Sequence, residues 1–263
     1  MTPMTSKLWD QRSSDKSGAT MRTELIYFTG KNTADETWYA ARLLAFTKAT
    51  RLQMTPDGFD KFMGVSPNDL LPELEYMSST IASSWEFIDV IFAINNISRA
   101  CAQQITRTRT ASYAMQSQRV TNMKDVTAHI PPTVHPNQLV LYQLALSSGI
   151  TSYEKLVSEG VSLEDARGVL PMNTHCNLIA KYNFRAWVDL IRARDSLRVQ
   201  DEYHNVITAM RNAVLKVWPW AGTFIEPKQS KAISLMEELA LELPQEMRTR
   251  LAKVADLLKK ETS

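Results

Sequence analysis

Apolar and polar residues recur with two different periods along this chain, and these periods predict both strands and helices. The segment Thr23–Thr29 has strand character and ends at Gly30. A helix then opens at Thr33–Glu36, where a polar cap and acidic residues precede apolar residues spaced three or four apart. The apolar, β-branched segment Phe87–Ile94 is interrupted only by Asp89 and predicts a largely buried strand.

Between these elements the pattern is weaker. Proline and glycine among polar residues predict a loop over Pro56–Pro72, with at most one short helix, followed by a helix over Leu74–Ser84. Asn95-Asn96 is a suitable cap for a helix over Ile97–Thr106. Arg107 would then lie at the C-terminal end of this helix, where cations are favoured.

The second half of the chain is mainly helical in pattern. Three proline residues predict a loop over Val120–Pro136. The helices predicted after it are Asn137–Ser148, Ser152–Glu159 beyond Gly149, one capped at Ser162, one from the region of Asn183 to Val217, and two amphipathic helices around Pro244. We interpret the last two as packing or oligomer elements, and residues 1–20 as a disordered polar leader.

Composition excludes several classes of function. The 263 residues are 44% hydrophobic and 22% charged, which is ordinary for a globular protein. The net charge is only +2, so the overall charge does not indicate nucleic-acid binding, and any anion binding must be local. Two cysteines, Cys101 and Cys176, make neither a disulfide framework nor a zinc site. The histidines His129, His135, His175 and His204 lack metal-ligand spacing, and we interpret each as a surface or core residue. Without a membrane-spanning run or signal peptide, we expect a cytoplasmic protein.

The segment Arg107–Arg119 carries three arginines and two serines and no acidic residue. A guanidinium presents a rigid fork of donors that suits phosphate and other planar anions. The segment is therefore either a basic surface turn or an anion-binding cradle.

The spacing within this segment resembles a signature of the flavin-dependent thymidylate synthases. That signature is Arg-His-Arg, then seven residues, then Ser, and usually Arg two residues further on. The matching residues in this chain are Arg107, Arg109, Ser112, Ser117 and Arg119. Thr108 replaces the central His, and Ala114-Met115 replaces the Asn and Glu of the family.

Further blocks match the same family in the expected order. Ser83 and Glu86 stand at the hydroxyl and carboxylate positions of a flavin-binding pattern, although Ile81 replaces its His, which lies near the folate in relatives. The family's Ala-Arg and Leu-Pro pairs match Ala166-Arg167 and Leu170-Pro171, and its later residues match Asn183, Arg185, Arg194, Gln200 and Glu202. Without the resemblance, each of these blocks can also be interpreted as a helix end or a solvated polar face.

The resemblance implies an α+β fold in which helices flank an antiparallel sheet, assembled as a homotetramer with active sites shared between subunits. It implies a catalytic domain over residues 21–225 and a helical extension over 226–263. The cofactor would be FAD, the reductant NADPH, the one-carbon donor methylenetetrahydrofolate and the substrate dUMP, with no nucleic acid, membrane or metal involved.

The resemblance also implies roles for individual residues. The dUMP phosphate would be bound by Gln104, Ser117, Arg119 and Arg167. The base would be contacted by Arg107 and Arg194, which would favour negative charge on its carbonyl oxygens and act as the catalytic residues. FAD would be bound by Ser83, Glu86, Arg107, Thr108, Arg109, Asn183, Arg185, Asp189 and Arg198.

Two alternatives follow from the departures at Ile81, Thr108 and Ala114-Met115. The first is hydroxymethylation of a pyrimidine deoxynucleotide, dUMP or dCMP, on the same scaffold, with water instead of hydride quenching the exocyclic methylene. The second is a nucleotide-binding paralogue without catalysis.

Overall fold

A four-stranded antiparallel sheet forms the centre of the protein. The computed structural model describes residues 20–49, 54–80, 82–194, 200–225, 247–251 and 253–254. The strands are β1 (Arg22–Phe28), β2 (Asp89–Ser98), β3 (Ser112–Met115) and β4 (His175–Asn183), in the order β1-β2-β4-β3. The fold is thus α+β with an antiparallel sheet, as expected, although the sequence analysis predicted neither β3 nor β4.

The sheet is amphipathic because residues of one strand point alternately to its two faces. In β2, Val90, Phe92 and Ile94 are fully buried, and β4 pairs Ala180 with Phe92 and Leu178 with Ile94. The opposite face is open in part, since Ile179 is 40% exposed. One face of the sheet therefore supplies the core.

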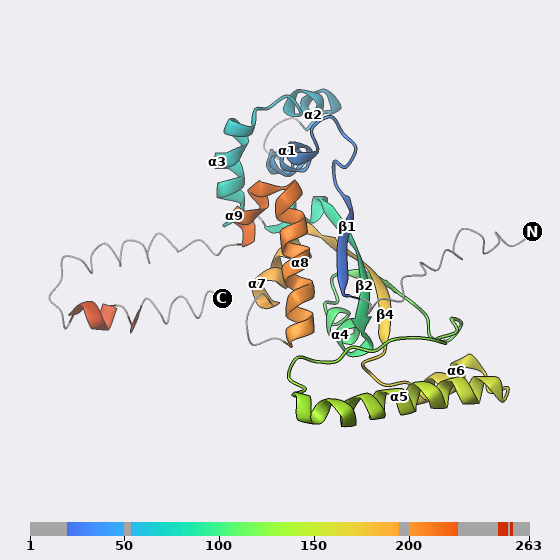
Figure 1. Ribbon diagram of the computed structural model, residues 1–263. Helices are drawn as coiled ribbons and strands as arrows, with labels where there is room; N and C mark the ends of the chain where they lie inside the picture. The colour runs from blue at the N-terminus through green and yellow to red at the C-terminus, as the bar shows by residue number, and fades with distance from the viewer. Residues whose placement is uncertain are drawn as a thin grey trace, which may run out of the picture.

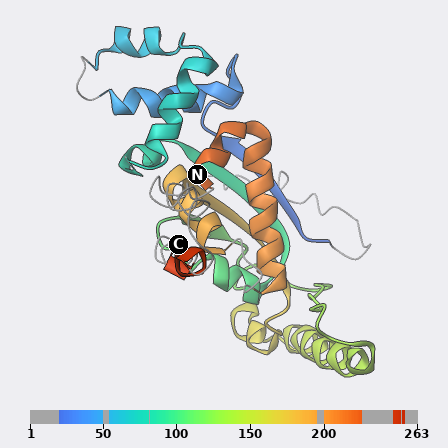
Figure 2. The same cartoon turned by 90° about the vertical axis from the view of Figure 1, so that its left-hand side faces the viewer.

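Helices cover the buried face. The helix α8 (Asp201–Val217) runs along β1 and β2, while α7 (Phe184–Arg194) and the short α4 (Arg99–Ile105) lie beside it (Figures 1 and 2). Beyond α8, the turn η4 (Pro219–Ala221) and helix α9 (Gly222–Ile225) return to α7. Phe184 stacks on Trp187 and contacts Trp218 edge-on, so aromatic packing joins α7 to the end of α8.

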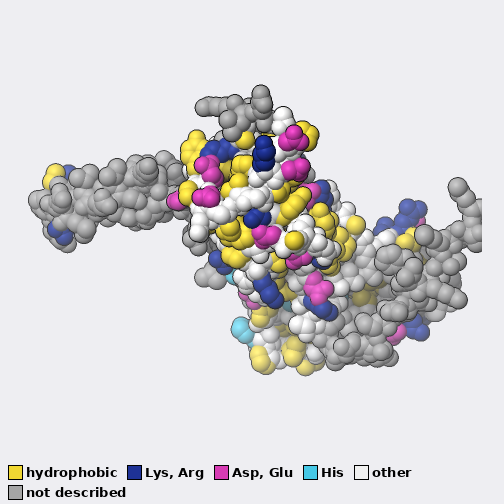
Figure 3. Space-filling view, turned by 90° about the horizontal axis from the view of Figure 1, so that it is seen from above, with side chains coloured by type: hydrophobic (Ala, Val, Ile, Leu, Met, Phe, Trp, Pro, Cys, Tyr) yellow, Lys and Arg dark blue, Asp and Glu magenta, His cyan; other side chains and the backbone are white. Residues whose placement is uncertain are grey.

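Three helices and a short 3-10 turn lie at the upper end of the sheet in Figure 1: α1 (Glu36–Lys48), α2 (Pro56–Phe62), α3 (Pro67–Met77) and η2 (Ala82–Phe87). The predicted loop over Pro56–Pro72 is wrong, because Thr55 and Ser66 cap two helices whose first residues are prolines. The predicted helix Leu74–Ser84 is also wrong in its bounds, since α3 ends at Met77. Seen from above, this end shows positive and negative side chains interspersed with apolar ones (Figure 3).

A second helical layer lies at the lower end (Figures 1 and 2). It contains α5 (Pro136–Ser158), α6 (Leu163–Ala166) and the 3-10 turn η3 (Arg167–Val169). The predicted break at Gly149 is wrong, because α5 is continuous there. Gly149 instead permits a close approach, since a Cβ atom on it would lie 2.9 Å from the Pro171 ring. The predicted start of a helix at Ser162 is confirmed, and its hydroxyl accepts the Asp165 N–H at 3.3 Å.

Two predicted boundaries near the arginine segment are corrected. The strand β2 extends to Ser98, and Ser98 rather than Asn95-Asn96 caps α4. Asn96 has a left-handed backbone conformation, with a φ of +56°, at the register shift between Ile94 and Ile97. An asparagine tolerates this conformation better than most residues, which explains its place in a bulge.

The single long helix predicted through Val217 is also wrong. Helix α7 ends at Arg194, and α8 begins at Asp201 after Gln200, whose ψ of 135° is extended. The predicted leader, apart from Thr20, and most of the two helices around Pro244 lie outside the described residues. Within the described ranges, no helix is both long and apolar enough to cross a membrane.

Candidate functional site

The expected site residues fall into three groups, and the first lies at the C-terminal end of α4. Gln104 is on the last turn of α4, and its side-chain amide donates to the Gln200 side-chain oxygen just before α8. Arg107 and Arg109 follow α4 and are exposed. Within the described ranges, neither guanidinium makes a hydrogen bond or an ion pair, so both are available to an anion.

Tyrosine hydroxyls hold the turn between these two arginines. The Tyr113 hydroxyl on β3 lies 2.9 Å from the Ile105 carbonyl oxygen and 3.0 Å from that of Thr108. It also lies 3.3 Å from the Tyr182 hydroxyl. Burial raises the pKa of Tyr113, so the phenol keeps the proton that it donates to these carbonyls.

Arg194 reaches the same region from the end of α7. Burial raises the pKa of Tyr203, and the positive charge of Arg194 opposes that shift. A hydrogen bond with Thr108 also lowers the pKa of Tyr203. Tyr203 on α8 is therefore close enough to Arg194 to feel its charge and also contacts Thr108, which follows the C-terminal end of α4.

A second group lies beside α6 and η3. The Ser117 hydroxyl accepts the backbone N–H of Arg119 at 3.2 Å. The Arg119 Nε forms an ion pair with Glu164 Oε2 at 2.9 Å, while Arg167 Nε donates to the Glu164 carbonyl oxygen at 3.0 Å. Arg119 and Arg167 thus both contact Glu164, and Ser117 contacts the backbone of Arg119.

A third group joins η2 to the start of α7. Arg185 Nη1 forms an ion pair with Glu86 Oε1 at 2.8 Å, and both side chains are about half exposed. Asn183 Oδ1 accepts the Ala186 N–H at 2.8 Å, which caps α7. Ser83 and Asp189 are exposed on the same two elements.

The three groups remain separate within one chain. Among the described residues, no hydrogen bond or ion pair joins the group around Glu164 to Gln104, Arg107 or Arg194. Ile81 and Arg198 lie outside the described residues.

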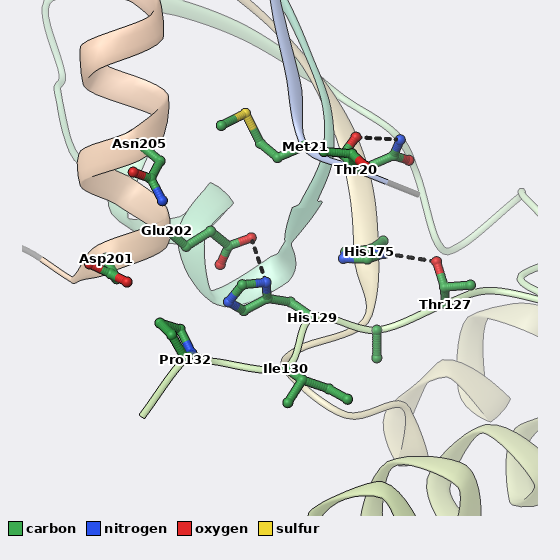
Figure 4. A pocket seen from close by; sticks show the side chains of 12 residues that line it. Thr20, Met21, Thr127, His129, Ile130, Pro132, His175, Asp201, Glu202 and Asn205 are labelled. Atoms are coloured by element: carbon green, nitrogen blue, oxygen red, sulfur yellow. Dashed lines mark hydrogen bonds and ion pairs between the residues drawn. The ribbon is translucent and has the colours of Figure 1, made fainter. Parts of the chain in front are cut away.

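A cavity of about 640 Å³, which the sequence did not predict, lies between the N-terminal end of α8 and the loop before α5 (Figure 4). Two histidines that we interpreted as surface or core residues line it. His129 Nδ1 lies 3.9 Å from Glu202 Oε1, and His175 Nδ1 lies 2.8 Å from the Thr127 hydroxyl. Burial lowers the pKa of His175, and Glu202 opposes that shift. These residues come together only in the folded chain, so sequence spacing carried no signal of the cavity.

Both cysteines are buried thiols. Burial raises the pKa of Cys101 far above its usual range, and the negative charge of Glu202 adds to the shift. Burial raises the pKa of Cys176 as well. Because the thiolate is the nucleophilic form, neither thiol is activated for attack on a substrate.

The sequence of this chain matches a known protein family. Residues 27–220 match the family described as thymidylate synthase complementing protein, Thy1. The chain belongs to this family. Its relatives include a protein of Geobacter sulfurreducens that is 32% identical over 181 residues, covering 66% of this chain and 78% of the relative. That relative is named flavin-dependent thymidylate synthase.

Other family members align over different shares of their length. A flavin-dependent thymidylate synthase of Pyrococcus horikoshii is 30% identical over 205 residues, covering 74% of this chain and 80% of the relative. One from Sulfurisphaera tokodaii is 30% identical over 141 residues, covering 52% of this chain. The matched part spans only 54% of that relative, so similarity does not extend over its whole length.

The fold is similar to that of a UMP/dUMP methylase from Streptomyces cacaoi, whose crystal structure contains 5-Br dUMP. The TM-score is 0.61 at 20% sequence identity, over 78% of this chain and 95% of the other. At this identity the likeness concerns the fold.

Proposed function

We propose that this protein is a flavin-dependent thymidylate synthase, which converts dUMP to dTMP with methylenetetrahydrofolate as the one-carbon donor and NADPH as the reductant. The observation that carries the proposal is a set of arginine side chains at the family's motif positions, of which three are exposed and Arg167 is half-buried. These are Arg107 and Arg109 after α4, and Arg119 and Arg167 around Glu164. Family membership and the names of the relatives support the same activity.

The group around Glu164 suits the phosphate of the nucleotide. Arg119 and Arg167 supply two guanidinium groups that both contact Glu164, and the Ser117 hydroxyl contacts the Arg119 backbone. Arg119 is 62% exposed and Glu164 49%, so their ion pair is weak and a phosphate can replace the carboxylate as partner. We assign the phosphate to these three residues together with Gln104.

Arg107 and Arg194 are assigned to the uracil base. Addition at C5 of uracil places negative charge on the ring carbonyl oxygens, and a fixed guanidinium stabilises that charge as it develops. The Tyr113 and Gln200 contacts hold the end of α4 in place, so Arg107 begins from a supported backbone. Such preorganisation is what makes a charged donor effective in catalysis.

The third group fits a flavin nucleotide. Glu86 and Arg185 offer an acceptor and a donor at the exposed junction of η2 and α7, and Asn183 and Ser83 add polar groups beside them. Arg107, Thr108 and Arg109 provide further donors, and Asp189 and Arg198 complete the expected set. When bound, reduced FAD supplies the hydride. The buried Cys101 and Cys176 agree with chemistry that needs no protein nucleophile.

We further propose that the protein works as a homotetramer in which neighbouring subunits complete each site. Among the described residues of one chain, no hydrogen bond or ion pair joins the residues around Glu164, assigned to the phosphate, to Arg107 and Arg194, assigned to the base. The partly open face of the sheet, with Ile179 40% exposed and Tyr27 44% exposed, also supports association.

One observation favours a second candidate, hydroxymethylation of dUMP or dCMP. Thr108 stands where the family has His, and the hydroxyl of Tyr113 and that of Tyr203 lie beside it. Hydroxyl groups in this position can order a water molecule near the reacting carbon, and water would then replace hydride in the last step. Since the S. cacaoi methylase is described as acting on UMP and dUMP, UMP belongs among the substrates to be compared.

Subunit mixing tests the proposed site. The variants Arg107→Ala and Arg119→Ala are each expected to lose at least about 100-fold in dUMP-dependent NADPH oxidation, because each removes a charged contact. Mixing the two after dissociation and reassembly should restore part of the activity, since some sites then receive both native residues. The control is Arg22→Ala, because Arg22 is 71% exposed and pairs with Glu24 on β1. Full activity of both single variants, or absence of FAD binding by the native protein, would contradict the proposal.

A further inference from the structure

A buried carboxylate joins α8 to the N-terminal end of α4. Glu202 is 4% exposed. Its Oε1 accepts the backbone N–H of Ser98 at 2.6 Å, and its Oε2 accepts the Ser98 hydroxyl at 2.5 Å. The Ser98 oxygen in turn accepts the Cys101 N–H at 2.9 Å, which makes Ser98 the N-cap of α4.

The same segment of α8 also holds the other end of α4. Gln200, two residues before Glu202, accepts the side-chain amide of Gln104 on the last turn of α4. Helix α4 has only seven residues, so these two contacts fix nearly its whole length against α8. A small helix held at both ends moves as one body, and Arg107 follows directly after it.

The contacts at Ser98 suit a carboxylate better than another polar side chain. Glu202 accepts two hydrogen bonds through two oxygens, and the Ser98 hydroxyl donates to it because an ionised carboxylate can only accept. An amide at position 202 offers only one oxygen, so one of the Ser98 donors would lose its acceptor. His129 Nδ1, at 3.9 Å, is the nearest ionisable nitrogen to Glu202 among the described residues.

We propose that Glu202 is a positioning residue for the nucleotide site: through Ser98 it sets the place of α4, and thereby of Gln104 and Arg107. The proposal rests on the proposed function for its effect on catalysis, although the positioning itself is a property of the fold. Because a displacement of about 1 Å can cost about 100-fold in rate, loss of this contact should affect activity more than folding.

The test compares Glu202→Gln and Glu202→Ala with Asp201→Ala. Asp201 is an exposed carboxylate on the same turn that borders the same cavity, so it is a matched control (Figure 4). We expect Glu202→Ala to lower kcat/KM for dUMP by about 100-fold and Glu202→Gln by about 10-fold, with the control unchanged. The variants should lose kcat/KM for dUMP, while the KM for NADPH should stay near its native value.

Chemical rescue separates positioning from general destabilisation. Glu202 faces the cavity of about 640 Å³, so formate can enter the space left in Glu202→Ala and accept the Ser98 donors again (Figure 4). Formate should therefore restore about 10-fold of the lost activity in Glu202→Ala, with no effect on the native protein or on Asp201→Ala. Activity of Glu202→Ala that equals the native value, or a KM for NADPH that rises as much as the KM for dUMP, would overturn the proposal.

Hydrogen exchange gives a readout that does not need dUMP turnover. In Glu202→Ala and Glu202→Gln, the backbone amides of residues 99–107 should exchange at least about 10-fold faster, while those of β1 and α7 keep their native rates. If the native protein does not act on dUMP, the proposed function fails and this exchange result still decides the positioning. Unchanged exchange in both variants would overturn it, as would faster exchange throughout the chain.

Discussion

At the scale of single residues, Thr108 is the most informative departure from the family signature. Its carbonyl oxygen lies 3.0 Å from the Tyr113 hydroxyl, and Tyr203 also forms a hydrogen bond with Thr108. Sequence spacing predicted site roles for Arg107, Arg109 and Ser117, because a motif is a local pattern. It did not identify Tyr113, since that contact exists only once β3 has paired with β4 and turned back towards α4.

Tyr113→Phe tests the hydroxyl contact with the end of α4. Removal of one such hydrogen bond should lower the free energy of unfolding by about 1 kcal/mol, and the looser turn should raise the KM for dUMP several-fold. Urea denaturation and steady-state kinetics measure the two effects. Tyr27→Phe is the control, because Tyr27 is 44% exposed on β1 and its hydroxyl makes no hydrogen bond to the described residues. Equal behaviour of the two variants would contradict this role.

At the scale of elements, strong periodic segments were predicted correctly and boundaries were not. The sequence predicted a strand at Thr23–Thr29 from its strand-forming residues and a helix after Thr33 from apolar residues spaced three or four apart, and both are confirmed as β1 and α1. The errors at Pro56, Pro67 and Gly149 share a cause. Proline and glycine were interpreted as breaks, whereas the two prolines start helices and the glycine allows α5 to pack closely.

Gly149→Ala tests the close approach of α5 to the segment after η3. Alanine favours a helix by about 1 kcal/mol, but the new Cβ would lie 2.9 Å from both the Pro171 ring and the Val169 carbonyl oxygen. Overpacking of this kind costs about 1–3 kcal/mol, so we expect a net loss of stability in urea denaturation. Gly168→Ala is the control, because nothing lies within 4 Å of the position that its new methyl group would take, and its stability should be near native. A stabilised Gly149→Ala protein would contradict the packing.

At the scale of the whole molecule, the core encloses several groups that must stay protonated. Burial raises the pKa of Cys101 and Cys176, and of Tyr113, Tyr182 and Tyr203, all of which lie between the sheet and the helices around α4. No sequence pattern predicted this cluster, because its members come from β3, β4, α4 and α8 and meet only in the folded chain.

This cluster predicts that the fold loses stability in alkali. Unperturbed thiols and phenols have pKa values of 9.0 and 10.0, and the folded protein holds the protons of Cys101 and Tyr182 to higher pH. The unfolded chain releases these protons at lower pH than the folded protein does. The free energy of unfolding is therefore unaffected by these groups below about pH 9, and above that pH it falls by up to about 1.4 kcal/mol per pH unit for each group.

Urea denaturation from about pH 8 to about pH 10.5 measures this loss. The variant Cys101→Ala should show a smaller decline than the native protein, because one of the buried acids is absent. Stability that stays constant over this range, or an equal decline in both proteins, would contradict the account.

The mass of the nucleotide product distinguishes the proposed reactions from one another. The purified protein would be incubated with FAD, NADPH, methylenetetrahydrofolate and dUMP, with UMP and dCMP in parallel reactions. We predict that dUMP gains one methyl group, which would show that the site works with Thr108 at the centre of its motif. Gain of a hydroxymethyl group would contradict the thymidylate synthase assignment in favour of the second candidate, and no change of any nucleotide would contradict both.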